Sequence, residues 1–283
     1  MNVARLLDPG LSATFQDSGR PGWRRFGVPA SGAMDHHSAI WANRLLNNPD
    51  HVPVIEFLLQ GAEIEILQDC WMAITGAESN GPIPTGTATL FFKGDRIRFP
   101  RNLHGVWIYL AVAGGWQTKS WLGSASVYAR ALMGKPLGKE QKLVSMPNNL
   151  SPFPAAVMSR RLKPEELTKG ASDNVFFLDK GPQFQDFPER SQTCLVESEW
   201  QVSTHSDRTG YRLEGPSLES GPEITSEPVL PGSFQIPGNG QPIVTMPDGP
   251  TVGGYPKIAY LEPKQRWQLA QCAPGTKIKF QWK

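Results

Sequence analysis

The sequence has few cysteines, no dense block of one charge and no long apolar run. Its three cysteines, Cys70, Cys194 and Cys272, are far apart and odd in number within 283 residues, so neither a disulfide framework nor a metal site is expected. Lysine and arginine total 28 against 26 acidic residues, a formal net charge of +2. No basic block suited to phosphates is present, which argues against a nucleic-acid partner.

No apolar stretch approaches the roughly 20 residues that a membrane-spanning helix needs. Asp8, Gln16 and Asp17 lie where a signal peptide would have its apolar core, and we therefore expect a cytoplasmic protein without membrane association. Generic catalytic signatures are also missing, because no GxxxxGK[ST] loop, no HExxH and no GxSxG elbow occurs. If the chain is an enzyme, its site must be assembled from scattered loops.

Glycine and proline are abundant instead, with 28 and 26 residues, so long helices have little room. Short apolar runs between these breaks are typical of a mainly β protein. Strands are expected at residues 90–92, 106–112, 174–178 and 277–280. One helix is expected at residues 36–46, where Asp35 can cap the N-terminus and apolar residues recur at helical spacing. A second, short helix is expected at residues 164–167, where a proline precedes two acids.

A cluster of charged residues, glycines and aromatics occurs twice. Residues 16–24 read QDSGRPGWR and residues 206–212 read SDRTGYR, so an Asp, an Arg, a Gly, an aromatic and an Arg recur in one order. Three further pairs of segments match in the same register: residues 6–10 with 177–181, 73–77 with 243–247, and 93–99 with 274–280. The repeat is longer than a solenoid unit of roughly 20–50 residues. We therefore predict two globular halves related by internal duplication.

The division between the halves is predicted near residue 155. Residues 146–154 contain three prolines and no periodic pattern, which is linker composition. The predicted domains are residues 1–155, including the linker, and residues 156–283. A chain of this length has room for two hydrophobic cores.

The two Asp–Arg clusters supply the candidate catalytic residues, Asp17, Arg20, Asp207 and Arg208. An Arg guanidinium can hold a planar carboxylate or phosphate by two parallel hydrogen bonds, and an Asp beside it can orient the Arg or take a proton from an amide nitrogen. A structural interpretation stays open, in which each pair clamps a tight turn, and duplication would preserve such an element.

Two other segments carry polar residues. Residues 251–256 read TVGGYP and could present backbone N–H groups to an anion, but a hairpin connection with glycine at positive φ is the favoured interpretation from the residues alone. His205 stands beside Ser206 and Asp207. Adjacent residues cannot form the hydrogen-bonded chain of a catalytic triad, so no triad is predicted.

Together these segments resemble the allophanate hydrolase subunit 2 family, which includes the C subunit of 5-oxoprolinase, the KipA proteins and part of the carboxyltransferase domain of urea carboxylase. The resemblance implies a pair of cyclophilin-like β-barrel subdomains, in agreement with the repeat. It rests on residues 16–22 (QDSGRPG), 27–35 (GVPASGAMD), 42–43, 56, 109–115 (YLAVAGG), 206–213 (SDRTGYRL), 251–256 (TVGGYP), 270–271 and 274–275.

The resemblance implies one part of an enzyme complex that opens the lactam of 5-oxoproline to glutamate at the expense of ATP. It implies a sister chain of the allophanate hydrolase subunit 1 (KipI-like) type, a protein like the A subunit of 5-oxoprolinase, and a small anionic amide as substrate. ATP is expected in the complex, on this chain or on a partner. The candidate substrate-binding residues are Gln16, Asn43, Glu56, Ser206, Tyr211, Arg212, Thr251, Gly253, Gly254 and Tyr255.

One segment departs from the family pattern. Where relatives carry GSRST, this chain reads GSASV at residues 123–127, which loses an arginine and a hydroxyl, and the sequence differs onward to Glu140. The departure favours, as an alternative, a KipA-like binding protein that antagonises a KipI-type kinase inhibitor. A further alternative is the carboxyltransferase subunit of a urea carboxylase-like system. Biotin would then be carried by another protein, because no AMKM carrier sequence is present.

Overall fold

The structure is a computed structural model that describes residues 1–79, 83–147, 159–163 and 174–283. The chain forms two compact units, Met1–Arg20 with Ser31–Lys169, and Pro21–Ala30 with Gly170–Lys283. Residues 21–30 thus belong to the second unit although they come from the first copy of the repeated motif, which the sequence did not indicate. The predicted boundary near residue 155 and the predicted helix at 164–167 lie outside the described residues.

The chain is mainly β, as predicted, and the expected strands are present. They are β6 (Thr87–Phe91), β8 (Asn102–Val112), β11 (Val175–Lys180) and β19 (Lys277–Trp282). The helix predicted at residues 36–46 is α1 (His36–Leu45). Asp35 caps it as expected, because its Oδ1 accepts a hydrogen bond from the Ser38 N–H at 2.9 Å. A cap of this kind is worth about 1 kcal/mol of helix stability.

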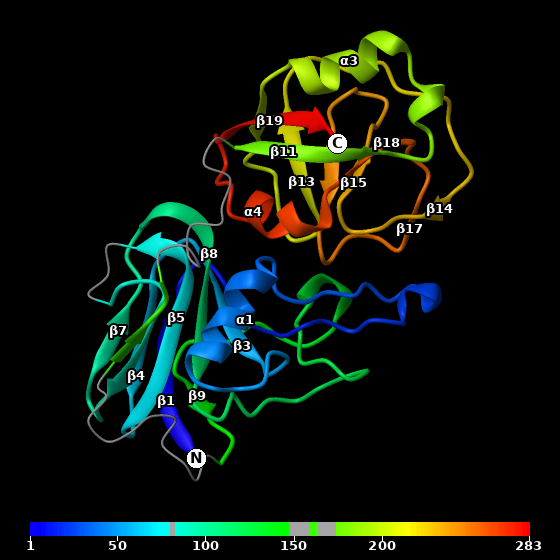
Figure 1. Ribbon diagram of the computed structural model, residues 1–283. Coiled ribbons are helices and arrows are strands. Elements are labelled where there is room, and N and C mark those ends of the chain that lie inside the picture. The colour runs from blue at the N-terminus through cyan, green and yellow to red at the C-terminus, as the bar shows by residue number, and fades with distance from the viewer. Residues whose placement is uncertain (80–82, 148–158, 164–173) are drawn as a thin grey trace. The chain divides into compact units, whose positions relative to one another are not determined.

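The first unit contains two antiparallel sheets (Figure 1). A four-stranded sheet runs in the order β7 (Arg96–Arg98), β4 (Ala62–Ile66), β1 (Asn2–Pro9) and β9 (Gln141–Val144). A six-stranded sheet runs in the order β10 (Ser159–Arg161), β6, β5 (Cys70–Ser79), β8, β3 (Val54–Leu58) and β2 (Ala13–Gln16). Helix α1 packs against β5 and β8. The strands described for this unit therefore fall into two sheets.

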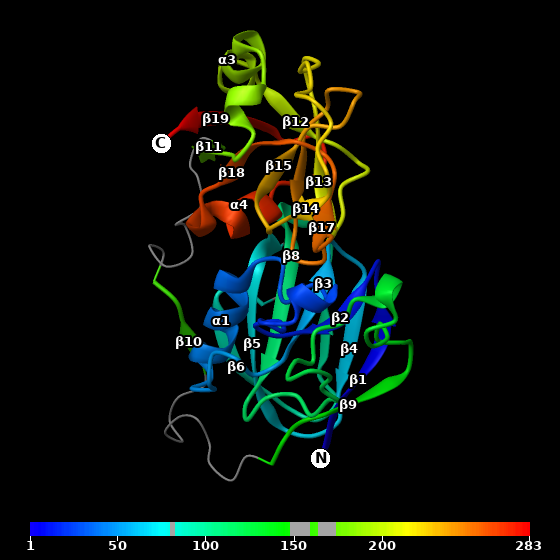
Figure 2. The same ribbon diagram turned by 90° about the vertical axis from the view of Figure 1, so that its right-hand side faces the viewer.

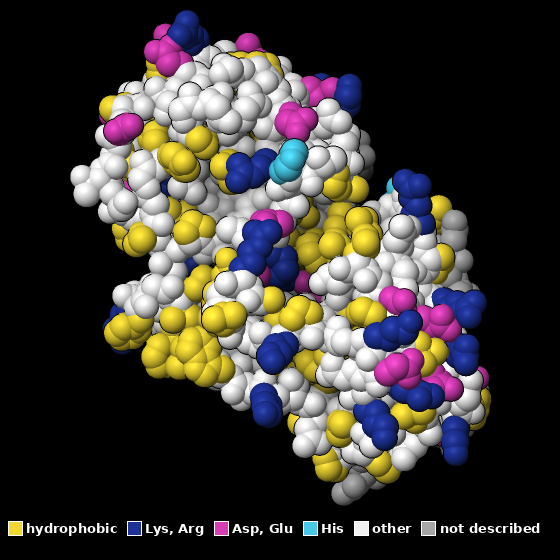
Figure 3. All heavy atoms as spheres, turned by 180° about the vertical axis from the view of Figure 1, so that it is seen from behind, with side chains coloured by type: hydrophobic (Ala, Val, Ile, Leu, Met, Phe, Trp, Pro, Cys, Tyr) yellow, Lys and Arg dark blue, Asp and Glu magenta, His cyan; other side chains and the backbone are white. Residues whose placement is uncertain are grey.

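Alternation along β4 shows how the four-stranded sheet divides core from solvent. Ala62, Ile64 and Ile66 are buried, while Glu63 and Glu65 point to the other face, as the two-residue period of a strand requires. On that outer face Glu65 pairs with Arg5 of β1, and Glu63 pairs with the two arginines of β7. Acidic and basic side chains accordingly lie intermixed at the right of Figure 3.

The second unit is a closed barrel with the strand order β11, β18 (Lys257–Leu261), β15 (Ser233–Gln235), β16 (Ile243–Thr245), β13 (Gly210–Glu214), β12 (Trp200–Val202) and β19. The barrel closes where β11 and β19 pair in parallel, at Val175↔Lys279 through Leu178↔Trp282. Phe176, Phe234 and Phe280 fill its centre, and the Phe234 and Phe280 rings meet edge to face at 5.0 Å between centroids.

Shorter elements complete the second unit. A two-stranded sheet pairs β14 (Glu227–Pro228) with β17 (Val252–Gly253). Helix α3 (Glu189–Glu197) packs against β19, as Figures 1 and 2 show, and α4 (Arg266–Ala270) follows β18. No helix within the described ranges is long and apolar enough to cross a membrane. The remaining helical turns are η1 (Arg24–Phe26) in the second unit, η2 (Ala129–Ala131) in the first, and η3 (Phe184–Asp186) and η4 (Pro263–Gln265) in the second.

Candidate functional site

In the first unit, Asp17 fastens the segment that departs from the family pattern. Its Oδ1 accepts hydrogen bonds from the hydroxyls of Ser124 at 2.6 Å and Ser126 at 2.5 Å, and from the Gly19 N–H at 2.8 Å. Its Oδ2 accepts one from the Ala125 N–H at 2.6 Å. A carboxylate that accepts four hydrogen bonds is held in one orientation. This arrangement suits a positioning residue.

Arg20 lies beside Asp17, with only 1% of its surface exposed. Its Nη2 donates to the Ser126 carbonyl, and its guanidinium lies 5.7 Å from the ring centroid of Trp121. Stacking of this kind stabilises a cation that has left water. Gln16 belongs to the same group, because its Nε2 donates to the carbonyl of Val127 at 2.9 Å. The structure thus brings Gln16, Asp17 and Arg20 together against residues 124–127.

Gly32 shows why the neighbouring loop needs a glycine. Its φ is +101°, and a Cβ there would lie 3.2 Å from both the Asp17 carbonyl oxygen and the Gly19 nitrogen. The loop can therefore approach the Asp17 turn closely only without a side chain at this position. The Ala33 N–H donates to the Asp17 carbonyl at 3.1 Å and closes the contact.

A second polar group of the first unit is buried around Glu56 and Tyr109. The Tyr109 hydroxyl donates to Glu56 Oε2 at 2.8 Å and accepts from the Asp35 N–H at 2.7 Å, while the Met34 N–H also donates to Glu56 Oε2 at 2.8 Å. Burial and the nearby Glu56 and Asp35 carboxylates hold the pKa of Tyr109 well above its ordinary value. The phenol therefore stays protonated and can act as a hydrogen-bond donor.

Asn43 lies in α1 and is buried. Its Nδ2 donates to the Val52 carbonyl at 2.8 Å, and its Oδ1 accepts from Asn48 Nδ2 at 3.2 Å. Asn48 in turn donates to the carbonyl of Val112 at 2.9 Å. This amide chain ties the end of α1 to β8, so the contacts of Asn43 are those of a residue that supports the site's scaffold.

In the second unit, Arg208 pairs with Asp248. Its Nε and Nη2 donate to the two Asp248 oxygens at 2.7 and 3.2 Å, and Asp248 is 1% exposed. Asp207 instead accepts from the Thr209 N–H at 2.7 Å and the Gly210 N–H at 3.2 Å, which closes its own turn. The two-pronged ion pair joins the start of β13 to the loop after β16.

Ser206, Tyr211 and Arg212 continue the same segment. The Ser206 hydroxyl accepts from the Arg212 N–H at 3.0 Å, and the buried Tyr211 hydroxyl donates to the Ala270 carbonyl at 2.7 Å. The Arg212 side chain is exposed. His205 Nδ1 lies 3.4 Å from the Ser203 hydroxyl, a contact within its own turn.

Within residues 251–255, Val252 and Gly253 form β17 and pair with β14, where Glu227 pairs with Gly253. The favoured expectation of glycine at positive φ is wrong here, because neither Gly253 nor Gly254 has a positive φ. A Cβ at Gly253 would instead lie 3.0 Å from Gln235 Nε2 and 3.1 Å from a Val229 methyl, so those side chains would have to shift by a few tenths of an ångström. The Thr251 carbonyl accepts from the Val229 N–H at 3.0 Å.

Tyr255 and Lys257 follow this pair on the chain. Tyr255 is 50% exposed, whereas Lys257 is 1% exposed and pairs with Glu227 of β14. The hydrogen bond from Lys257 holds the pKa of Glu227 below its ordinary value. The buried lysine thus anchors β14, and β17 with it, to the barrel strand β18.

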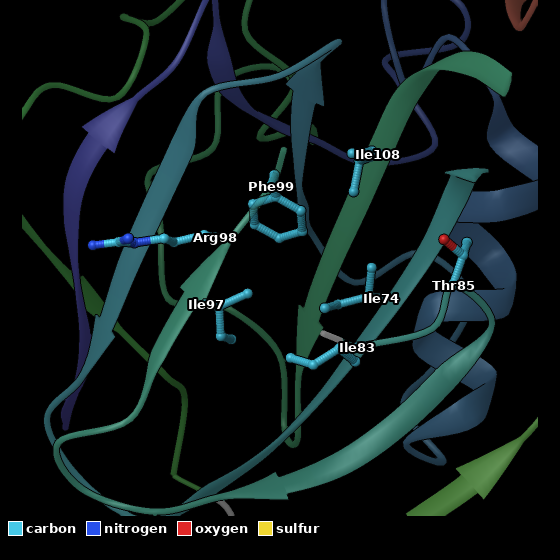
Figure 4. A pocket seen from close by; sticks show the side chains of 7 residues that line it. All are labelled: Ile74, Ile83, Thr85, Ile97, Arg98, Phe99 and Ile108. Atoms are coloured by element: carbon cyan, nitrogen blue, oxygen red, sulfur yellow. The ribbon is translucent and has the colours of Figure 1, made fainter. Parts of the chain in front are cut away.

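One small pocket inside the first unit is lined mainly by apolar side chains: Ile74, Ile83, Thr85, Ile97, Arg98, Phe99 and Ile108 (Figure 4). Its volume of about 10 Å³ is near the smallest that holds one water molecule, so it is too small for a substrate. Within the described parts of the chain, no group of three or more His, Cys, Asp or Glu side chains could hold a metal ion. Burial raises the pKa of the Cys272 thiol to about 12, which makes it a poor nucleophile.

These observations define a class of protein. It is mainly β, contains a closed barrel, and has loops that are held by Asp and Arg side chains. The family model described as "Carboxyltransferase domain, subdomain A and B" matches residues 26–282. The chain belongs to this family, and the resemblance found in the sequence is confirmed.

Individual relatives show which members of the family the chain resembles. The chain is 34% identical to the C subunit of 5-oxoprolinase from Escherichia coli (strain K12) over 286 residues, which cover 98% of this chain and 90% of that protein. It is 30% identical to urea amidolyase of Lachancea kluyveri over 304 residues, which cover 97% of this chain and 16% of that protein.

Among solved structures, the chain matches TTHA0988 with a TM-score of 0.87 and 32% identity, covering 99% of this chain and 56% of that one. The chain therefore spans about half the length of TTHA0988. In that structure, and in urea amidolyase, further polypeptide accompanies the module that this chain resembles.

Several residues of the polar groups described above were not predicted from the sequence. Tyr109, Asp35, Asp248, Ser124 and Ser126 complete the hydrogen bonds of predicted residues, yet none was a candidate for the site. Ser126 lies 109 positions from Asp17, and Asp248 lies 40 from Arg208. The sequence offered one indication, the departure of residues 123–127 from the family pattern. That departure marks the segment but does not show which residue the segment contacts.

Proposed function

We propose that this chain is the C-type subunit of a complex that opens 5-oxoproline to glutamate with consumption of ATP. One observation carries the proposal. The similarity to the C subunit of 5-oxoprolinase extends over 98% of this chain and 90% of that protein, whereas the similarity to urea amidolyase involves 16% of the relative. Nearly the whole of the C subunit is thus matched, which supports the first activity.

The chemistry of the substrate indicates what the protein must provide. A lactam amide resists attack by water until its carbonyl is polarised or its oxygen is converted to a leaving group, and donors aimed at the developing charge supply that stabilisation. The substrate also carries a carboxylate that needs a cation. The exposed Arg212 is the candidate we assign to this carboxylate, because Arg20 and Arg208 are already engaged by Ser126 and Asp248.

ATP is assigned to a partner chain. Both engaged arginines are largely withdrawn from solvent, since Arg20 is 1% exposed and the Arg208 side chain 17%. The sequence also lacks a phosphate-binding loop. We therefore expect the nucleotide on an allophanate hydrolase subunit 1-like protein or on a protein like the A subunit of 5-oxoprolinase. The relative's name, which makes it one subunit of an enzyme, supports the need for such partners.

Within this proposal Asp17 and Asp207 position loops, and Glu56 with Tyr109 provides a buried donor–acceptor pair in the first unit. The catalytic role predicted for Asp17, Arg20, Asp207 and Arg208 stays a prediction. Their hydrogen bonds support roles in holding the loops, because each carboxylate accepts from backbone or hydroxyl donors of its own loop or of a neighbouring loop.

The test combines the purified chain with the subunit 1-like and A-type proteins of its own organism, ATP and 5-oxoproline. Glutamate and ADP should form only when all proteins are present. Arg212→Ala should raise the KM for 5-oxoproline by about 10–100-fold, the loss expected for a charge-assisted contact. Arg101→Ala removes another exposed arginine, in the first unit, and should leave KM unchanged. Absence of glutamate from the complete mixture would reject the proposal.

The similarity to urea amidolyase supports carboxyl transfer as a second candidate. In that case biotin would arrive on another protein, and avidin would abolish the activity of the assembled system. The KipA-like regulatory role also stays a prediction. Tight binding of the subunit 1-like partner without turnover of 5-oxoproline or of a biotin-dependent acceptor would favour it.

A further inference from the structure

The second unit exposes five large apolar side chains on neighbouring segments, which we call the apolar patch: Trp23, Phe26, Leu230, Val252 and Tyr255. Each is between 37% and 62% exposed. Together they make up five of the twelve large hydrophobic side chains that are exposed in the described part of the chain. Contiguous apolar surface of this kind marks an interaction site more often than scattered exposure does.

Hydrogen bonds hold the segments of the apolar patch together. The Arg24 Nη2 donates to the carbonyl of Val229 and, at 3.1 Å, to that of Pro250. This fastens residues 21–30 to both sides of the β14–β17 pair, where Pro228 pairs with Val252. The dark blue segment accordingly lies next to β14 and β17 in Figures 1 and 2. The patch is therefore a fixed surface, not a set of independent loop tips.

The aromatic part of the apolar patch carries a positive charge at its edge. The Trp23 and Phe26 rings lie 5.8 Å apart between centroids, and the Arg25 guanidinium lies 4.8 Å from the Phe26 ring. Aromatic and arginine side chains are the types that dominate binding energy at protein interfaces. A matching surface would be apolar at its centre, with an acidic side chain opposite Arg25.

The comparisons show that this module has a polypeptide neighbour in some relatives. The module is part of a longer polypeptide in TTHA0988, of which this chain covers 56%, and is a separate protein as the C subunit of 5-oxoprolinase, of which it covers 90%. A module that is covalently joined to its neighbour in one protein needs a stable docking surface where it is separate. We propose that the apolar patch docks the subunit 1-like partner. This inference rests on the proposed function, because it requires that partner.

The experiment measures the dissociation constant between this chain and the purified subunit 1-like protein of its own organism by titration calorimetry. Phe26→Asp and, separately, Val252→Asp should weaken binding by roughly 30-fold or more, as loss of a central apolar contact does. Phe92→Asp changes an exposed phenylalanine in the first unit and should stay within about twofold of wild type. Circular dichroism of each variant checks the fold.

The outcomes separate the inference from the function on which it rests. If the wild-type chain does not bind the subunit 1-like protein, the proposed complex fails and the docking surface with it. If wild type binds and both patch variants bind equally well, only the docking surface is overturned. Sedimentation of the chain alone provides a third outcome, because a dimer that Phe26→Asp dissociates would mean that a second copy covers the apolar patch, which would overturn the assignment of the partner.

Discussion

Asp17 and Asp207 occupy equivalent places in the two copies of the repeated motif, and each accepts a hydrogen bond from the backbone N–H two residues further on, at 2.8 and 2.7 Å. Beyond this shared turn the copies differ. Asp17 also holds residues 124–126, whereas both backbone donors described for Asp207 lie within its own turn.

The arginines differ as well. Arg20 is buried against a carbonyl and the Trp121 ring, while Arg208 forms a two-pronged ion pair with Asp248. Duplication has therefore kept the local turn and changed the long-range contacts of its arginine. The repeated sequence predicts the turn, because the turn depends on neighbouring residues, but each arginine's partner comes from a different part of the chain.

Asp248→Ala should have the largest effect. Removal of Asp248, which is 1% exposed, breaks the two-pronged ion pair with Arg208 and should cost about 3–5 kcal/mol of unfolding free energy. Urea unfolding measures this loss of free energy. Hydrogen exchange of the backbone amides of β13 and β16 shows whether the loss is located at these strands. Asp186→Ala, an exposed control in the same unit, should stay within about 0.5 kcal/mol of wild type. Equal costs for the two variants would contradict the assigned importance of the pair.

Substitution of the two aspartates tests the difference between the copies directly. Asp17→Ala removes the acceptor for four donors and should cost about 3 kcal/mol, whereas Asp207→Ala removes the acceptor of a short turn and should cost about 1 kcal/mol. Thermal unfolding of both variants gives the ranking. A larger loss for Asp207→Ala would show that the second copy, and not the first, depends on its aspartate for long-range structure.

Tyr109 adds a pH-dependent difference to the first unit. Its pKa lies well above the ordinary value of 10.0 in the folded protein, so the unfolded chain releases this proton first as the pH rises past about 10. The contribution of the Tyr109 hydroxyl to the free energy of unfolding is complete below that pH and falls by about 1.4 kcal/mol per pH unit above it. Tyr109→Phe should cost about 1–2 kcal/mol at pH 7.

The stability gap between wild type and Tyr109→Phe should therefore narrow above pH 10, which urea unfolding at pH 7, 10 and 11 can measure. A gap that stays constant across this range would mean that Tyr109 titrates normally.

The smallest effect is expected at the solvent face of the four-stranded sheet. Arg5 pairs there with Glu65, with 38% of the Arg5 side chain exposed, and exposed pairs are screened by water and salt. Arg5→Ala should leave the midpoint of thermal unfolding close to that of wild type, and salt should remove what difference remains. A loss comparable to that of Asp248→Ala would overturn the distinction between exposed and buried pairs.

Local features were predictable from the sequence because their causes are local. The cap at Asp35, helix α1, and strands β8 and β19 follow from spacing and residue type, and the family followed from motifs along the chain. The placement of residues 21–30 in the second unit did not follow, because it depends on Arg24 contacts with carbonyls more than 200 positions away. Helix α3 was also missed, since it begins after Pro188 without a side-chain cap and buries only Ser191 and Leu195.

The residues of the candidate site also divide into those that the sequence predicts and those that it does not. Gln16, Asp17 and Arg20 were predicted as neighbours on the chain and are found together, while Asn43 joins a separate amide network. Tyr109 and Asp248 could not have been chosen, because their importance arises from the pairing of strands and loops that lie far apart in sequence.

The most direct test of the proposed activity is the formation of labelled glutamate from labelled 5-oxoproline by the subunit 1-like and A-type proteins with ATP, measured with and without this chain. We expect glutamate and ADP in equal amounts when the chain is present and neither when it is left out. Glutamate formation that is independent of the chain, or ATP consumption without glutamate in the complete mixture, would contradict the proposed function.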